Sequence, residues 1–248
     1  MKKGQLVVFI AVGFFLVIIV FLLFAMMKFT GGKIVVEEAT DITSFTQACV
    51  EKTAKDGLIY LGLVGGNIKP PVFANVIEMD FDEYTIPYYY FKGVVYYTGA
   101  SQLEGILKKY IEDNFATCLN KYKQFPAYQV AETVFTASVK IQDSDVDVRV
   151  YYPATLTKGN SILHFERFVV SVPVRMKEIS QVAGVITDGL KSDVESIPWD
   201  YFTTLGERQF NMTVYTVGKD TLVYRIVDEK NIVGNEPYIF QFAARIER

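Results

Sequence analysis

Residues 6–27 read LVVFIAVGFFLVIIVFLLFAMM, and this run decides the architecture of the chain. Its 22 residues include no charge, amide, hydroxyl or proline, and 17 of them are Val, Leu, Ile or Phe. As a helix the run would be about 33 Å long, which matches the roughly 30 Å hydrocarbon core of a bilayer. A helix that is apolar on every side does not fit the surface of a globular domain. We therefore expect a transmembrane helix over residues 5–28.

A cleaved secretory signal is the alternative interpretation of this run. Such signals have apolar cores of about 7–15 residues, followed by a cleavage site of the small-x-small type. The core here is longer, and Ala25-Met26-Met27 does not form such a site. We therefore expect the apolar segment to stay attached to the protein.

The orientation of the span follows from what comes after it. Lys2 and Lys3 precede the run and Lys28 and Lys33 follow it, so the positive-inside rule gives nearly a tie. Two cysteines and one Asn-x-Thr sequon, at Asn211, are typical of an exported domain. We expect a protein of the cell membrane with a cytoplasmic N-terminus and an extracellular C-terminal domain.

The residues before the run are Lys2-Lys3-Gly4-Gln5. Basic residues and Gly-Gln at the head of an unbroken apolar helix resemble the class III leader of archaeal type IV pilin-like proteins. The resemblance implies that a dedicated peptidase cuts between Gly4 and Gln5. It also implies that the retained helix is a membrane anchor first and the core of a filament afterwards.

The resemblance is confined to residues 1–28, and it departs from the family pattern at two positions. Many pilins carry Glu at the fifth mature position and often Ser at the third, where this chain has Phe9 and Val7. The resemblance therefore implies processing more strongly than filament assembly. The other interpretation is that these residues are the ordinary cytoplasmic flank of a membrane anchor.

The fold class predicted for the whole chain is α+β, with antiparallel β-sheets and amphipathic helices in an exported region. Five segments are predicted: a basic leader (1–4), a transmembrane or filament-core helix (5–28), a linker (29–41), a helix-strand-helix lobe (42–125) and a strand-rich α+β lobe (126–248).

Two amphipathic helices are predicted in the first lobe. One begins at Thr43 or Ser44 and stops at Gly65-Gly66, with Gly57 expected to end it early or bend it. The other covers residues 101–122, where apolar residues recur at spacings of one, three and four. Its N-terminus is predicted to be a capping box of Ser101 and Glu104.

Cys49 and Cys118 lie on the inward faces of these two helices. We predict that the helices pack together and that the cysteines form a disulfide outside the cell. Closing a loop of about 70 residues would contribute roughly 4 kcal/mol in the chain-entropy treatment. Two free buried thiols that pack as small hydrophobic side chains are the alternative.

The remaining pattern predicts strands, turns and one more helix. Pro87 is expected to restrict its strand to a sheet edge, and Lys92-Gly93 is a two-residue turn signal. The other predicted elements are a hairpin over 132–152, a long strand over 161–176, a helix over 177–197, a hairpin that turns at Gly218-Lys219, and a closing strand over 238–247.

Composition restricts the partners. The net charge of −3 and the lack of Lys-rich or Arg-rich stretches argue against nucleic acid, because phosphate binding needs a basic face. The predicted partners are the lipid bilayer and further copies of the chain, in a homo-oligomer or filament joined through the N-terminal helix. The surface ligand is not predicted.

No residue is predicted to be catalytic, and no metal or other cofactor is expected. The single His164 lies on a predicted strand, and two cysteines with one histidine are too few for a structural zinc site. Asp143, Asp145 and Asp147 lack the Gly and Glu of a calcium loop, because those positions hold Val148 and Ala154. The acids in the stretch 78–83 are interpreted as a charged surface.

The sequence therefore predicts a membrane-anchored structural or interaction protein of the cell surface, which is not an enzyme. A monomeric anchored domain that binds a glycan or envelope partner is the alternative. An exported enzyme with a carboxylate pair ranks third, and whether two carboxylates share a cleft would distinguish it.

Overall fold

The computed structural model describes residues 18–19, 39–67, 76–78, 85–131, 133–192, 205 and 209–246. The predicted leader with Gly4 and Gln5 lies outside these residues, as does the predicted span except for Ile18 and Ile19. These two isoleucines are helical and exposed. None of the helices in the described ranges is both long and apolar enough to cross a membrane.

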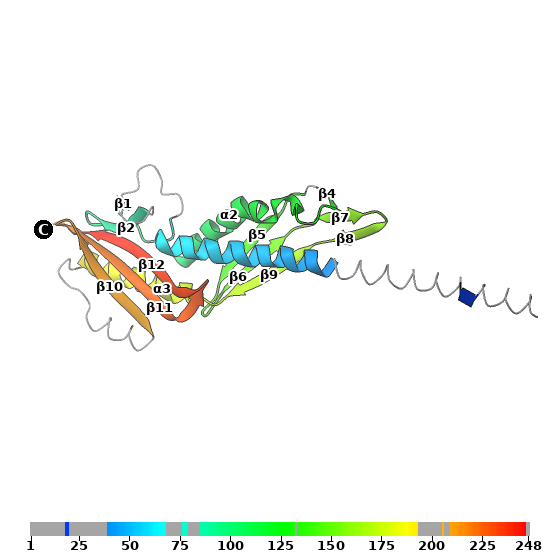
Figure 1. Cartoon of the computed structure of the whole chain (residues 1–248). Coiled ribbons are helices and arrows are strands. Elements are labelled where there is room, and N and C mark those ends of the chain that lie inside the picture. Colours follow the sequence, from blue (N-terminus) through cyan, green and yellow to red (C-terminus); the bar gives the residue numbers. More distant parts are fainter. Residues whose placement is uncertain are drawn as a thin grey trace, which may run out of the picture.

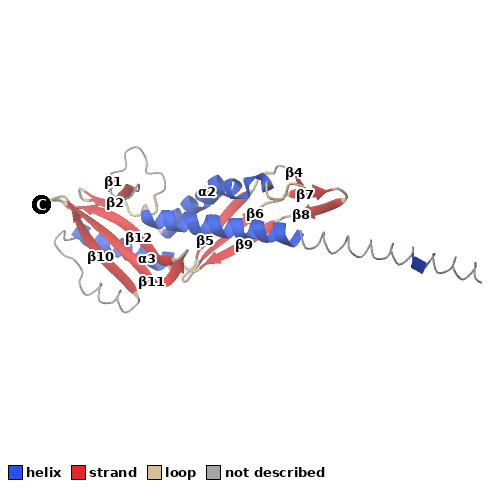
Figure 2. Cartoon of the chain, in the orientation of Figure 1, coloured by secondary structure: helices blue, strands red, loops and turns tan. Residues whose placement is uncertain are grey.

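The predicted α+β class with antiparallel sheets and amphipathic helices is confirmed (Figure 2). The first helix described over more than two residues, called the long helix, covers residues 39–63 of the described chain. The elements after it are β1 (Val76–Glu78), β2 (Thr85–Phe91), β3 (Val94–Val95), α2 (Ala100–Leu119), η1 (Asn120–Tyr122), β4 (Gln129–Ala131), β5 (Thr136–Ile141), β6 (Val146–Tyr151), β7 (Thr155–Lys158), β8 (Ser161–His164), β9 (Arg167–Val172), α3 (Met176–Ser192), β10 (Phe210–Val217), β11 (Thr221–Val233) and β12 (Glu236–Arg245).

Three sheets follow one another along an elongated body (Figure 1). The large sheet has the order β1-β2-β12-β11-β10, with β3 paired to β2, and lies at the end that holds the C-terminus. The middle sheet is β5-β6-β9, and the small sheet β4-β7-β8 forms the opposite end. The long helix runs lengthwise along the body, and its blue N-terminal end points towards the side that holds β7 and β8 (Figure 1).

The long helix differs from its prediction at both its start and its middle. It is already helical at residue 39, inside the predicted linker, and Thr43 is an interior position whose hydroxyl donates to the Ala39 carbonyl at 2.8 Å. It continues through Gly57, because the missing side chain leaves room for Leu107 and Tyr110 of α2. The predicted early end at Gly57 is therefore wrong.

The long helix stops where the sequence predicts. Gly65 and Gly66 both have positive φ, and the Gly66 N–H donates to the Leu61 carbonyl at 2.6 Å. This left-handed glycine end satisfies carbonyls that the last turn leaves without a helical partner.

α2 buries the predicted stripe but begins earlier than predicted. Its fully buried residues are Leu103, Leu107, Ile111, Phe115 and Leu119. The cap is Gly99, whose N–H donates to the Gln102 side chain at 3.1 Å, so the predicted capping box of Ser101 and Glu104 is wrong. Glu104 instead accepts the Ile141 N–H of β5 at 2.9 Å, a contact that local sequence does not reveal.

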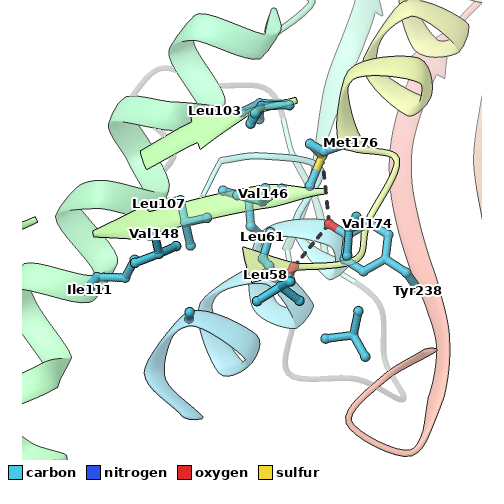
Figure 3. Packing of buried hydrophobic residues seen from close by; sticks show 14 of the residues in the cluster. Leu58, Leu61, Leu103, Leu107, Ile111, Val146, Val148, Val174, Met176 and Tyr238 are labelled. Carbon is cyan, nitrogen blue, oxygen red and sulfur yellow. Dashed lines mark hydrogen bonds between the residues drawn. The ribbon is translucent and has the colours of Figure 1, made fainter. Parts of the chain in front are cut away.

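The middle sheet packs one face against both helices. The inward residues of β6 are Val146, Val148 and Val150, which alternate with exposed or half-buried neighbours. Figure 3 shows Val146 and Val148 beside side chains of α2 and the long helix in one hydrophobic cluster. The predicted hairpin of β5 and β6 is confirmed.

One strand pairing in the large sheet has no signal in the local sequence. β2 pairs antiparallel with β1 and parallel with β12, so it is not an edge strand as Pro87 suggested. The β12 ladder starts at Tyr88, after the proline, so the missing N–H leaves that ladder intact. The turn at Lys92-Gly93 joins β2 to β3 as predicted, with positive φ at both residues.

The single strand predicted over 161–176 is wrong in one respect, because Phe165 and Glu166 separate it into two strands. Its first part is β8 of the small sheet and its second part is β9 of the middle sheet. Buried Phe165 donates its N–H to the Ala154 carbonyl at the break. α3 follows and covers one face of the large sheet, where Met176 contacts Tyr238 (Figure 3).

Strand pairing and hydrophobic packing both cross the predicted boundary between the two lobes. β2 belongs to the first predicted lobe, yet it pairs with β12 of the second. Buried residues from Ile42 to Ile246 also belong to one hydrophobic cluster.

Candidate functional site

The predicted disulfide is present and joins the long helix to α2. The Cys49 and Cys118 sulfurs are bonded, and their Cα atoms lie 5.6 Å apart across a separation of 69 residues. Cys49 is buried, as expected for the inward face of an amphipathic helix. The bond lies within three turns of residue 39, so it fixes the first described part of the long helix to the body.

The long helix is also tied to both larger sheets. Near its start, the Gln47 side chain donates to the Val169 carbonyl of β9 at 2.9 Å. Near its end, the Tyr238 hydroxyl of β12 donates to the Leu58 carbonyl at 3.1 Å (Figure 3). At Gly62 the helix backbone approaches β12 so closely that a Cβ atom would lie 2.1 Å from the Ile239 carbonyl oxygen. The long helix therefore connects α2, the middle sheet and the large sheet.

A left-handed turn follows α2 immediately after the disulfide. Asn120, Lys121 and Tyr122 have φ values of 46°, 52° and 52°. Left-handed backbone costs L-residues roughly 1–2 kcal/mol each, although Asn tolerates it better than most. Tertiary contacts hold this turn, because Tyr122 is buried and its hydroxyl lies 2.9 Å from the Thr46 hydroxyl of the long helix.

An aromatic pocket opens beside this turn. Its volume is about 360 Å³, at the lower end of the range for ligand sites. Tyr122 and Tyr152 form its floor, while half-buried Tyr128 and Phe135 line its opening. The remaining lining residues are Ala116, Leu119, Lys121, Val130 and Thr133.

The chemistry of the pocket is that of neutral phenols and aromatic faces. Burial raises the pKa of Tyr122 and of Tyr152 above the ordinary value of 10. Both hydroxyls therefore stay protonated at neutral pH, and that of Tyr122 donates to the Thr46 hydroxyl, which itself donates to the Ile42 carbonyl. The Lys158 ammonium lies 5.5 Å from the centre of the Tyr128 ring, at the side of the pocket.

A buried ion pair is the other polar feature that the sequence did not reveal. Arg175, just before α3, binds Asp228 of β11 through two contacts of 2.5 and 3.2 Å, and Asp228 is fully buried. The carboxylate also accepts the Lys230 N–H and the Asn231 amide. Because these donors occupy its oxygens, Asp228 has no capacity left for a substrate proton. Its role is structural.

The residues considered for metal or acid–base chemistry are scattered. His164 is exposed on β8 and lies 3.0 Å from the Thr155 hydroxyl. Asp143 pairs with Lys177 of α3 at 2.6 Å, and Asp145 accepts a hydrogen bond from Ser171 of β9. These two acids of the predicted hairpin therefore bind side chains of neighbouring elements. The acids of 78–83 fall outside the residues whose side chains are described.

Within the described ranges, no three histidine, cysteine or acidic side chains are grouped so that they could hold a metal ion. The predictions of no catalytic residue and no cofactor stay predictions.

Asn211 lies on β10, which ends the strand order of the large sheet, and its side chain is exposed. Thr213, the third residue of the sequon, is exposed as well. The predicted glycosylation site is therefore accessible in the folded chain.

Comparison with known proteins gives no family: no family model, no curated protein and no solved structure matches this chain.

Proposed function

We propose that the chain is a membrane-anchored structural or interaction protein of the cell surface. The observation that carries the proposal is the set of contacts that hold the long helix, which is described from residue 39 and lies after the apolar run that ends at Met27. The disulfide, the Gln47 contact and the close crossing at Gly62 make this helix the rigid attachment of the body. An anchor before residue 39 would thereby hold the whole body.

The disulfide also supports export, because structural disulfides persist in oxidising compartments. On this proposal the N-terminus is cytoplasmic and the body extracellular. The Gly4-Gln5 leader adds the finer proposal that the mature chain starts at Gln5 and enters a pilin-like filament through its apolar helix.

The experiment that tests this proposal measures the mature N-terminus of the membrane-bound protein by mass spectrometry. A chain that starts at Gln5 supports pilin-type processing, and Gly4→Leu should abolish the cut while leaving the protein in the membrane. A chain that still starts at Met1 contradicts processing and leaves the plain anchor. Electron microscopy of material sheared from cells then tests whether filaments form.

The aromatic pocket favours a second candidate, an anchored domain that binds a glycan. Aromatic faces and hydroxyl donors suit the apolar and polar faces of a sugar ring, and Tyr128 presents both at the opening. Saturation-transfer NMR with a panel of neutral mono- and disaccharides tests this candidate. Signal that is lost in Tyr128→Ala but kept in Tyr96→Ala, an exposed tyrosine elsewhere, supports it. Equal signal in both variants contradicts it.

A further inference from the structure

β10 is an edge strand of the large sheet in the part of the chain that the structure describes. It pairs with β11 along all eight residues from Phe210 to Val217, and no described strand pairs with its other side. The register has no shift along this ladder, so the edge is regular and about 27 Å long. An edge of this kind presents a row of backbone groups to which a strand of another molecule can pair.

The other edges in the described part of the molecule are short or occupied. On β5, the N–H groups of Ala137 and Ile141 donate to Glu112 and Glu104 of α2. On β9, the Val169 carbonyl accepts from Gln47 of the long helix. The edge strands β1, β3, β4 and β8 have two to four residues each.

β10 lacks the usual protections of an exposed edge. Its sequence, FNMTVYTV, contains no charge and no proline, and its β-branched and aromatic residues favour extended pairing. The register shifts in this sheet lie between β11 and β12, at Asp228 and Ile232, and between β12 and β2, at Ala243 and Ala244, whereas the β10–β11 ladder has none. Proteins normally protect a long edge with a lysine, a proline or a bulge, and β10 has none of them.

β10 does carry the sequon, in a geometry that suits modification. Asn211 and Thr213 are two residues apart on one strand, so their side chains share a face, and both are exposed. The opposite face packs inward through Phe210. The Asn211 amide has only a 3.4 Å contact to exposed Glu229, which leaves its nitrogen accessible.

We propose that an N-linked glycan on Asn211 guards the β10 edge and prevents strand pairing between copies of the chain. The inference rests on the proposed export of the body. In the transfer, the Asn211 amide nitrogen forms a bond to the anomeric carbon of a lipid-linked glycosyl phosphate donor. The bond from that carbon to the phosphate oxygen breaks, the lipid phosphate leaves, and the amide loses one proton.

The test uses the full chain, expressed in a host that glycosylates exported proteins and extracted in detergent. Peptide mass mapping should find a glycan on Asn211 in the unsubstituted chain and in Thr213→Ser, which keeps the sequon. Thr213→Ala and Thr213→Lys should both lack the glycan. The lysine variant differs from the alanine variant by placing a charge on the bare edge.

Self-association is then measured by light scattering at matched detergent and protein concentrations. We expect Thr213→Ala to form oligomers that are at least twice the mass of the unsubstituted chain, and Thr213→Lys to remain as dispersed as that chain. Equal dispersion of Thr213→Ala and the unsubstituted chain would overturn the edge role. Association of Thr213→Lys to the same extent as Thr213→Ala would overturn it too.

The oxidation state of Cys49 and Cys118, measured in the same samples, separates this inference from the proposed function. An oxidised pair with unmodified Asn211 overturns the glycan alone. A reduced pair with unmodified Asn211 overturns both the glycan and the export on which it rests.

Discussion

Gly62 lies where the long helix crosses β12. A glycine inside a helix normally costs about 1 kcal/mol relative to alanine, so this position needs a packing reason. The reason is the contact with β12, because an added Cβ would meet the Ile239 carbonyl oxygen at 2.1 Å and the Tyr238 hydroxyl at 2.7 Å. Backbone and a buried ring cannot move aside easily, so Gly62 sets the distance between helix and sheet.

Gly62→Ala should therefore lower the free energy of unfolding, by about 1–3 kcal/mol, as in other overpacked cores. Gly105→Ala is the matched control, because Gly105 is also helical and has no atom within 4 Å of an added Cβ. It should raise the unfolding free energy by about 0.5–1 kcal/mol. Denaturant titration of both variants measures the difference, and a stabilising Gly62→Ala would contradict the close crossing.

Asp228 is the buried charge on which the start of α3 depends. Asp228→Ala leaves the Arg175 guanidinium buried without its partner, and the expected loss is about 3–5 kcal/mol. Asp113→Ala removes one partner of the exposed Lys109 pair and should cost less than about 1 kcal/mol. Thermal unfolding of the two variants makes the comparison, and equal losses would show that the buried pair has no special role.

The elements that the sequence predicts well are those with local signals. α2 has its apolar spacing, the β2–β3 turn has Lys92-Gly93, and the β10–β11 hairpin turns beside Gly218. The pairing of β2 with β12 joins Tyr88 to Ala243, so no local pattern contains it. The sequence suggests that Gly57 ends its helix, whereas the structure shows that the glycine makes room for side chains of α2. That contact is also not local in the sequence.

The features of the candidate site also divide into those with a local sequence signal and those without one. The disulfide could be predicted because both cysteines lie on inward faces of amphipathic helices. The aromatic pocket could not, because its residues come from α2, the left-handed turn, β4 and the chain segments next to β5 and β6. A run of Asn120-Lys121-Tyr122 gives no sequence signal for left-handed backbone, since only Asn favours it.

The disulfide should contribute most to holding the long helix on the body. Replacing Cys49 and Cys118 by serine together should lower the unfolding free energy by roughly 4 kcal/mol in the chain-entropy treatment. Hydrogen exchange should show that the amides of residues 39–49 lose protection more than those of β12. Chemical reduction of the unsubstituted chain is the control and should give the same loss. A loss below about 1 kcal/mol would contradict this role.

The whole body should lose stability at alkaline pH. Burial raises the pKa of Tyr224 to about 12, and it also raises the pKa values of Tyr89 and Tyr238 above the ordinary value of 10. Because these phenols ionise more easily once unfolded, with an ordinary pKa of 10, the stabilisation is complete below pH 10. It is lost as the pH rises from 10 towards the folded pKa values.

Denaturant midpoints measured across this pH window check the effect, with tyrosinate absorbance as the second signal. Tyr224→Phe keeps the ring, so its stability should fall less steeply between pH 10 and 12 than that of the unsubstituted chain. Parallel pH profiles for the two proteins would contradict the burial of this hydroxyl as the cause.

The body as a whole is proposed to be attached to the membrane by the run over residues 6–27 and to face outward. Carbonate extraction of membranes, followed by protease treatment of intact cells, measures both properties together. The proposal predicts that the chain stays in the membrane pellet, that external protease digests the body, and that deletion of residues 6–27 releases the chain from the membrane. A full-length chain that is recovered in the soluble cytosol with Cys49 and Cys118 reduced would contradict it.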